Sequence, residues 1–224
     1  MIVFIFLLIL ISCSKNETPS QNYAIVGTIM TLSGFPDTLA GVLIRIKNLK
    51  DDIYVQDAIV KLNGNQITYN SSALGYLTTA IYKKNQNYKV EISFSSYNVN
   101  VDCQSGELDS VRVFVDKDSV IKGDIINVRW KYFGVPNGKN MILLKKKGSV
   151  EFNSSSGYIP ISDTTYQLST SNLEITDYDL LLISGNFCEI NGFVPYPNFP
   201  SSLIFVGRGS NLIIKVRWES YFLF

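Results

Sequence analysis

Apolar and polar residues alternate along much of the chain. The clearest alternation covers residues 88–94, 97–103, 124–132 and 210–218. Successive side chains of a β-strand point to opposite faces, so each of these runs predicts a strand with one buried face and one face in water. No stretch shows the period of a helix of ordinary length. The pattern therefore predicts an all-β fold.

A strong turn signal, Asn63-Gly64, lies between two strand-like runs. This dipeptide readily adopts the positive φ angles of a two-residue type I′ turn, so we expect a β-hairpin here. Shorter apolar runs bounded by Gly, Pro, Asp or Asn predict further strands, and residues 32–39 predict a loop. These strands are expected at 24–30, 42–46, 75–81, 111–115, 141–145 and 176–183, with a strand pair within 158–168.

The run 57–93 resembles the transthyretin-like or carboxypeptidase-regulatory-like sandwiches of bacterial surface proteins. It comprises a strand, the Asn63-Gly64 turn, a second strand, a loop of small residues, and Tyr88 opening an alternating strand. The resemblance implies a small Ig-like β-sandwich, which we place at residues 23–106. It brings no catalytic residue with it.

Residues 104–110 are a short polar segment between two strand-rich blocks, which is typical of a domain boundary. We expect a second sandwich at 107–224. Its alternating run 124–132 resembles the strand of fibronectin-III or Ig-like domains that carries the core tryptophan, here Trp130. Tyr178 resembles the corner tyrosine of such domains, whose hydroxyl bonds back to the preceding turn. The expected architecture is two tandem Ig-like antiparallel β-sandwiches.

The first residues of the chain have a different pattern, an uninterrupted apolar run at 2–11 followed by polar residues. A bilayer core of roughly 30 Å needs about 20 apolar residues, so this run is too short to span it. A run of this length is typical of a cleaved signal peptide, which we place at residues 1–12, although no Lys or Arg precedes it.

The end of the leader, Leu10-Ile11-Ser12-Cys13, resembles the lipobox of bacterial lipoproteins. The resemblance implies that Cys13 carries lipid and becomes the mature N-terminus. Residues 13–22 are polar and predict a flexible tether. Ser14, after the lipidated cysteine, resembles the signal for outer-membrane delivery. The expected location is thus the cell envelope, anchored by lipid, at the outer membrane and facing either the periplasm or the surface.

The charge balance argues against a nucleic-acid partner. The chain has 20 Lys and Arg against 19 Asp and Glu, a net charge of +1, and its longest run of one sign is Lys145-Lys146-Lys147. That leaves no basic footprint for nucleic acid. The three lysines either touch anionic lipid or form the solvated end of a strand.

Two cysteines remain if Cys13 is lipidated. In an oxidising envelope, Cys103 and Cys188 either form one inter-domain disulfide or stay as separate buried thiols. Their sequence separation does not decide between the two.

The residues for catalysis are sparse. The chain has no histidine, which excludes Ser-His-Asp and Cys-His nucleophile systems and His-dependent metal sites. It has neither a GxxxxGK nor a GxGxxG motif, so no nucleotide site is indicated. We expect no enzyme activity, cofactor or metal. The remaining alternative is a glycan-active enzyme with paired carboxylates. Its candidate pairs are Asp51 with Asp52, Asp116 with Asp118, and Asp177 with Asp179.

The stretch 185–202 combines aromatic rings with prolines and glycines in what the pattern predicts to be a long loop. Long loops of this kind often carry function, so the rings are candidates for binding a glycan, a peptide or an envelope protein. The alternative is that they pack beneath the loop and fill the joint between the domains. The candidate residues are Phe187, Phe193, Tyr196 and Phe199.

Together these features predict a lipid-anchored envelope protein that acts as a binding or structural module. The alternatives are an envelope glycan-active enzyme and adhesin-like binding through the 185–202 loop.

Overall fold

The computed structural model describes residues 22–32 and 38–218. The predicted signal peptide, Cys13 and all of the tether except Asn22 lie outside these residues. Within the described ranges every regular element is a strand, and none of the chain forms a helix long and apolar enough to cross a membrane. The all-β prediction is confirmed.

The strands form one large and two small sheets. The large sheet has the order β14-β13-β17-β18-β1-β2-β7-β6, and β11, β15 and β3 pair with β18, β13 and β2. Its strands are β1 (Tyr23–Leu32), β2 (Leu39–Asn48), β3 (Ile53–Tyr54), β6 (Tyr69–Asn70), β7 (Gly75–Ile81), β11 (Ser119–Ile121), β13 (Lys139–Lys146), β14 (Ser154–Ser155), β15 (Ile159–Pro160), β17 (Asp177–Glu189) and β18 (Leu203–Arg217). The first small sheet has the order β5-β4-β8-β9 and the second β10-β12-β16. Their strands are β4 (Ile59–Leu62), β5 (Asn65–Ile67), β8 (Asn87–Phe94), β9 (Tyr97–Gln104), β10 (Leu108–Val115), β12 (Ile125–Gly134) and β16 (Thr165–Ser169).

Local sequence signals account for several of these strands. Asn63 and Gly64 have φ angles of 49° and 82° and join β4 to β5 as predicted, with Leu62 opposite Asn65. The alternating runs 88–94 and 97–103 lie in β8 and β9, which pair with each other. Their apolar positions are buried because one face of each strand packs on the large sheet.

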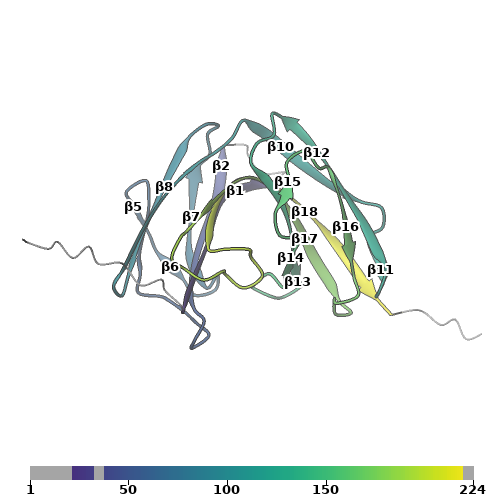
Figure 1. Cartoon of the computed structure of the whole chain (residues 1–224), viewed down its shortest axis with the longest axis horizontal. Helices are drawn as coiled ribbons and strands as arrows, with labels where there is room; N and C mark the ends of the chain where they lie inside the picture. Colours follow the sequence, from purple (N-terminus) through teal and green to yellow (C-terminus); the bar gives the residue numbers. More distant parts are fainter. Residues whose placement is uncertain (1–21, 33–37, 219–224) are drawn as a thin grey trace, which may run out of the picture.

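The two small sheets cover different parts of the same face of the large sheet. The first small sheet and β1, β2 and β7 enclose one hydrophobic core, which contains Ile29, Ile44 and Ile92. The second small sheet and β13, β17 and β18 enclose another, which contains Trp130, Leu182 and Ile214. Figure 1 shows the result as an arch, with the large sheet inside and the small sheets outside. We call the concave, inner side of this arch the hollow.

Two long strands run through both halves of the arch. β17 pairs along its whole length with residues 203–215 of β18, and β1 pairs in parallel with the first part of β18. Along one face of β18 the residues 204 and 206 enter the first core, and 212, 214 and 216 enter or border the second. The predicted boundary at 106/107 separates the two small sheets, but the large sheet continues across it. The domain limits 23–106 and 107–224 stay a prediction.

A polar layer separates the two cores along these strands. Ser184 on β17 and Arg208 and Ser210 on β18 are buried between the apolar ends of each strand. The guanidinium of Arg208 donates from Nε to the Leu108 carbonyl at 3.1 Å and from Nη1 to the Thr31 hydroxyl. It therefore links β1 in one half to β10 in the other.

Glycines on the paired strands permit a close approach at this layer. Gly185 on β17 lies opposite Gly207 on β18, and Gly185 has a φ of 155°. A Cβ added to Gly185 would lie 2.4 Å from the Val206 carbonyl oxygen, and one added to Gly207 would lie 2.3 Å from that of Ser184. Glycine inside a strand is typical of positions where another backbone approaches closely, and these two glycines lie next to the polar layer between the two cores.

Three aromatic predictions have different outcomes. Trp130 is 4% exposed in the second core and donates its indole N–H to the Tyr132 hydroxyl at 2.9 Å, as expected for a core tryptophan. The Tyr178 hydroxyl accepts the Glu174 backbone N–H at 2.9 Å, so its role as a corner residue is confirmed. The alternating run 210–218 places Trp218 on the apolar face with Ile214 and Val216. In the structure β18 ends at Arg217, and Trp218 is 73% exposed.

Candidate functional site: an apolar groove and a buried arginine in the hollow

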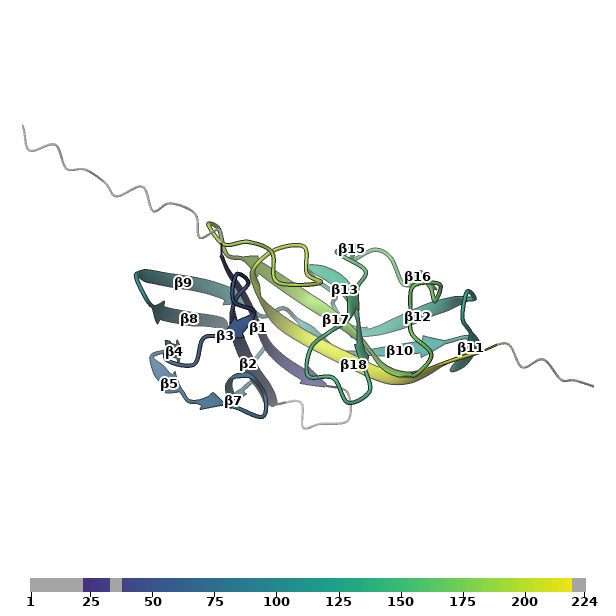
Figure 2. The ribbon, with the colours of Figure 1, turned by 90° about the horizontal axis from the view of Figure 1, so that it is seen from below.

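The hollow contains a third hydrophobic cluster. The small sheets do not cover this face. The side chains that the central strands turn toward the hollow are buried by two segments, 147–158, which includes the two-residue strand β14, and 190–202. Figure 2 looks into the hollow from below, with the β17–β18 connection over one end of the sheet. The buried members are Ala24, Val26, Met141, Leu143, Ile183, Tyr196, Phe199, Leu203 and Phe205.

The four aromatic candidates of the 185–202 stretch lie in or against the cores. Tyr196 and Phe199 are 3% and 7% exposed in the third cluster, and Phe187 packs on the same cluster from β17. Phe193 packs against the first core, with its ring 5.6 Å from that of Tyr97. The loop is also shorter than predicted, because β17 continues to Glu189. This arrangement corresponds to the packing alternative and does not present the rings as a binding platform.

Beside the covered part of the hollow lies an open apolar groove of about 280 Å³, which we call the outer groove. It is formed by side chains that β1, β2 and β7 turn toward the hollow. Two of its leucines, Leu39 and Leu77, are 43% and 44% exposed. Its walls are Thr28, Met30, Leu32, Leu39, Gly41, Val42, Leu43, Leu77 and Thr79. Gly209 on β18 leaves room for two of these side chains, because a Cβ there would lie 2.6 Å from Met30 and 2.9 Å from Leu32.

The outer groove adjoins a narrower space of about 160 Å³, which we call the inner cavity. The two share Thr28, Met30 and Leu43 as lining residues. The remaining walls of the inner cavity are Val26, Arg45, Leu143, Phe152, Leu181, Ile183, Tyr196 and Phe199. Arg45 is the only charged residue among the linings of these two spaces in the described part of the chain, and it is 6% exposed.

An ionic cluster lies next to Arg45 on the same face of β2. Lys47 Nζ lies 2.8 Å from Asp52 and 3.1 Å from Glu151, and Glu151 also accepts hydrogen bonds from the Tyr54 and Tyr196 hydroxyls. Burial opposes the charge of Lys47, but the two carboxylates hold its pKa above the ordinary value. Burial strongly raises the pKa of Tyr196, so its hydroxyl stays protonated. The cluster fixes the segment 147–158 over the hollow.

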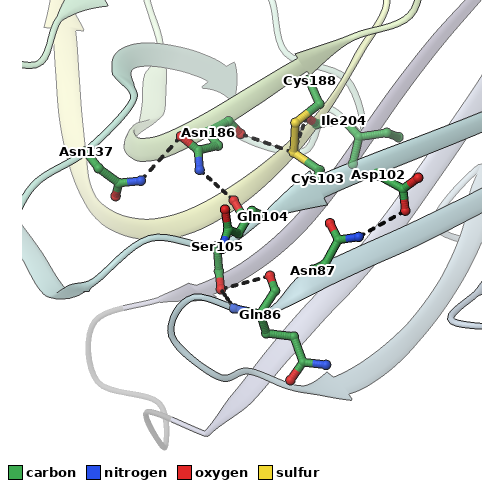
Figure 3. Close-up of a disulfide and its surroundings, with 10 residues drawn as sticks. All are labelled: Gln86, Asn87, Asp102, Cys103, Gln104, Ser105, Asn137, Asn186, Cys188 and Ile204. Carbon is green, nitrogen blue, oxygen red and sulfur yellow. Dashed lines mark hydrogen bonds between the residues drawn. A yellow bond between two sulfur atoms is a disulfide. The ribbon is translucent and has the colours of Figure 1, made fainter.

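The structure joins Cys103 to Cys188 in a disulfide, with the two Cα atoms 5.8 Å apart. Of the two alternatives left open by the sequence, the structure thus contains the disulfide. Figure 3 shows the contacts around it: the Asn186 side chain donates to the Gln104 carbonyl at 2.6 Å and accepts from Asn137 at 3.3 Å. These contacts hold the segment between the small sheets against β17, so this is a structural joint.

Three carboxylates of the candidate pairs are held by basic or amide side chains. Asp177 lies 2.7 Å from Arg217, and Asp179 lies 3.4 Å from Lys145. The Asp177–Arg217 hydrogen bond lowers the pKa of Asp177. Asp116 accepts hydrogen bonds from Asn127, which likewise lower its pKa. None of these shifts makes a proton donor near neutral pH. Among the described residues no group of three His, Cys, Asp or Glu is placed to hold a metal.

Sequence reasoning missed the residues of the outer groove and, apart from Tyr196 and Phe199, those of the inner cavity. One signal was present: Arg45 and Lys47 interrupt the apolar positions of the strand 39–48 on the face shared with Leu39 and Leu43. A charge on an otherwise apolar strand is either solvated or engaged in a specific site. The sequence pattern alone does not show that this face is enclosed by segments 100 or more residues away.

Comparisons with known proteins do not identify a family. No protein-family model and no curated protein matches the chain. Among solved structures, the chain is similar to the fibronectin(III)-like modules of Clostridium thermocellum CbhA, with 10% identity over 89% of this chain and 96% of that chain, and a TM-score of 0.28. It is similar to a chimeric titin Z1Z2, with 13% identity over 89% of this chain and 98% of that chain, and a TM-score of 0.29. It is also similar to the N-terminal four Ig domains of Dscam1 isoform 8.4, with 8% identity over 86% of this chain and 43% of that chain, and a TM-score of 0.23. At these TM-scores the three proteins indicate no ligand, partner or activity for this chain.

Proposed function

We propose that this protein is a non-catalytic binding module of the cell envelope, anchored to the outer membrane by lipid on Cys13, with its binding site in the hollow. The anchor rests on the leader and the Leu10-Ile11-Ser12-Cys13 sequence. The disulfide between Cys103 and Cys188 supports the location, because such bonds persist in oxidising compartments and are rare in the cytosol.

The observation that carries the binding role is the outer groove. Concave, mostly apolar surfaces with a few placed polar groups are typical ligand sites. Here such a surface is formed by strands held rigidly in the large sheet, and Leu39 and Leu77 remain partly exposed within it. A purely structural spacer would need no such opening.

The binding role is tested by titrating the protein with Nile red, a neutral apolar dye. We expect Leu39→Asp and Leu77→Asp to weaken dye binding several-fold, because each places a charge in the groove. The matched control is Ile125→Asp, since Ile125 is 50% exposed on β12, away from the hollow. Equal loss of dye binding in all three variants, or in none, would contradict the proposal.

The anchor is tested by metabolic labelling with an alkynyl palmitate analogue. We expect label on the wild type and on Cys188→Ala, and none on Cys13→Ala, which should also leave the membrane fraction. A Cys13→Ala variant that still labels and still sediments with membranes would remove the anchor from the proposal without affecting the dye test.

A further inference from the structure

The inference begins with the hydrogen bonds of Arg45. Its Nε and Nη2 atoms donate to the Ala73 carbonyl at 3.1 and 3.0 Å, and Nη2 also donates to the Val150 carbonyl at 3.1 Å. Both acceptors are neutral. Although Arg45 is buried, it forms no ion pair with a carboxylate in the described part of the chain, whereas its neighbour Lys47 on the same face pairs with two.

The Glu151 carboxylate, which pairs with Lys47, shares the Tyr196 hydroxyl with Arg45 and does not bond the guanidinium directly. A buried guanidinium without a directly paired anion is unfavourable, and arginine cannot relieve the cost by losing its proton. An anion in contact with the guanidinium would offset it. Because Nε and Nη2 already donate to the Ala73 and Val150 carbonyls, Nη1 is the nitrogen left to donate a charge-assisted hydrogen bond to a carboxylate. The fixed contacts of Nε and Nη2 orient the group, so the side chain is already positioned on the wall of the inner cavity.

The space next to Arg45 determines the rest of the ligand. From the inner cavity the lining continues along Met30 and Leu43 into the outer groove, toward Leu39 and Leu77. Apart from Arg45, these side chains offer no charge to a ligand. Volumes of about 160 and 280 Å³ are near or below the lower end of small-molecule sites, roughly 300–1,000 Å³. Two adjoining, mostly apolar spaces with a single cation in the lining of the inner one fit a chain-like molecule with an anionic end.

We propose that the hollow binds the acyl chain of a fatty acid, with its carboxylate on Arg45 and its hydrocarbon chain along Met30 and Leu43 into the outer groove. This deepens the binding role proposed above and does not depend on the lipid anchor. The free acid supplies both features of the site, a carboxylate for the guanidinium and apolar surface for the groove.

The test compares dodecanoate with dodecanol by displacement of Nile red, below the concentration at which either aggregates. A charge-assisted hydrogen bond contributes about 1.5–3 kcal/mol, so the acid should bind at least about tenfold more tightly than the alcohol. In Arg45→Gln we expect the two affinities to become equal within about twofold. Arg45→Lys should keep part of the preference, because it keeps the charge and loses the hydrogen bonds to Ala73 and Val150 that orient the guanidinium.

Arg45 also holds the segments at Ala73 and Val150, so a second set of variants protects the test against unfolding. Leu39→Asp and Leu77→Asp leave Arg45 intact and should weaken both ligands, whereas Ile125→Asp should weaken neither. Circular dichroism of each variant shows whether the fold is kept.

The outcomes separate this inference from the binding role. Equal affinity of the wild type for acid and alcohol would overturn the role of Arg45 and leave an apolar binding groove. Displacement of the dye by neither molecule would overturn the fatty-acid class. Failure of the dye itself to bind would overturn the binding role and this inference together.

Discussion

Cys103 and Cys188 join β9 of the first small sheet to β17, a strand of the large sheet that continues into the second half of the arch. The two residues are 85 positions apart in the sequence, and their Cα atoms lie 5.8 Å apart. Cys103 is fully buried in the first core. The bond therefore attaches a sheet built early in the chain to a strand built near its end.

Removal of this disulfide should destabilise the protein strongly. On the chain-entropy model, a loop of this length gives a loss of about 4–5 kcal/mol in the free energy of unfolding for Cys103→Ala with Cys188→Ala. Urea denaturation with and without a reductant measures it. The reductant should shift the wild-type transition and leave that of the double variant unchanged, and coincident wild-type transitions would contradict the prediction.

Arg208 should be a stability residue of the joint between the two halves. Its side chain is 4% exposed and donates to the Leu108 carbonyl and the Thr31 hydroxyl. The guanidinium carbon lies 4.3 Å from the centre of the Tyr82 ring. Arg208→Ala leaves these groups without their donor and opens a cavity, so we expect a loss of about 3–5 kcal/mol in chemical denaturation. Exposed Arg112 on β10 is the control, and Arg112→Ala should cost no more than about 0.5 kcal/mol. Equal losses of unfolding free energy in Arg208→Ala and Arg112→Ala would contradict the role of Arg208 as a stability residue of the joint.

Alkaline pH should destabilise the fold through Tyr82. Burial raises the pKa of this phenol from 10.0 to about 12, although the nearby charge of Arg208 opposes the rise. The unfolded state therefore loses its proton first, so the contribution of Tyr82 is complete below pH 10 and is lost as the pH rises toward 12. The shift corresponds to about 2–3 kcal/mol.

The measurement for Tyr82 is the free energy of unfolding as a function of pH. In Tyr82→Phe the decline between pH 10 and 12 should be shallower than in the wild type, although buried Tyr196 will continue to contribute above that range. Parallel curves for the two proteins would show that Tyr82 is not responsible.

The corner hydroxyl of Tyr178 gives a smaller prediction. Tyr178→Phe keeps the ring in the second core and removes only the acceptor of the Glu174 N–H, so we expect a loss of about 1 kcal/mol. Tyr166→Phe is a control, since its ring packs at the edge of the same core. The difference between the two variants in urea midpoint isolates the corner bond, and no difference would argue against it.

Local patterns determined the strands that have one buried and one exposed face. The alternation at 88–94 and 124–132, the Asn63-Gly64 turn and the burial of Trp130 followed from periodicity and turn chemistry, because each depends on residues close together in the sequence. The predicted signal peptide and lipid anchor likewise rest on a contiguous stretch, and they lie outside the described residues.

Long-range pairing decided the rest. The run 185–202 was expected to be a loop, but 185–189 pairs with 203–207, so its first part is strand and its rings turn inward. On β18 the even-numbered positions from 204 to 216 form one face, which is apolar at both ends and polar at Arg208 and Ser210. The polar positions in its middle are explained only by the tertiary structure, in which one sheet contributes to two separate cores.

The hollow shows the same division between sequence and tertiary structure. The sequence by itself determined that this is an all-β chain with amphipathic strands and a leader suited to lipid anchoring. Only the tertiary structure decided that Met30, Leu39, Arg45 and Leu77 share one concave face. The physical reason is that the burial of Arg45 depends on carbonyls 28 and 105 positions away, and no local periodicity encodes contacts at such separations.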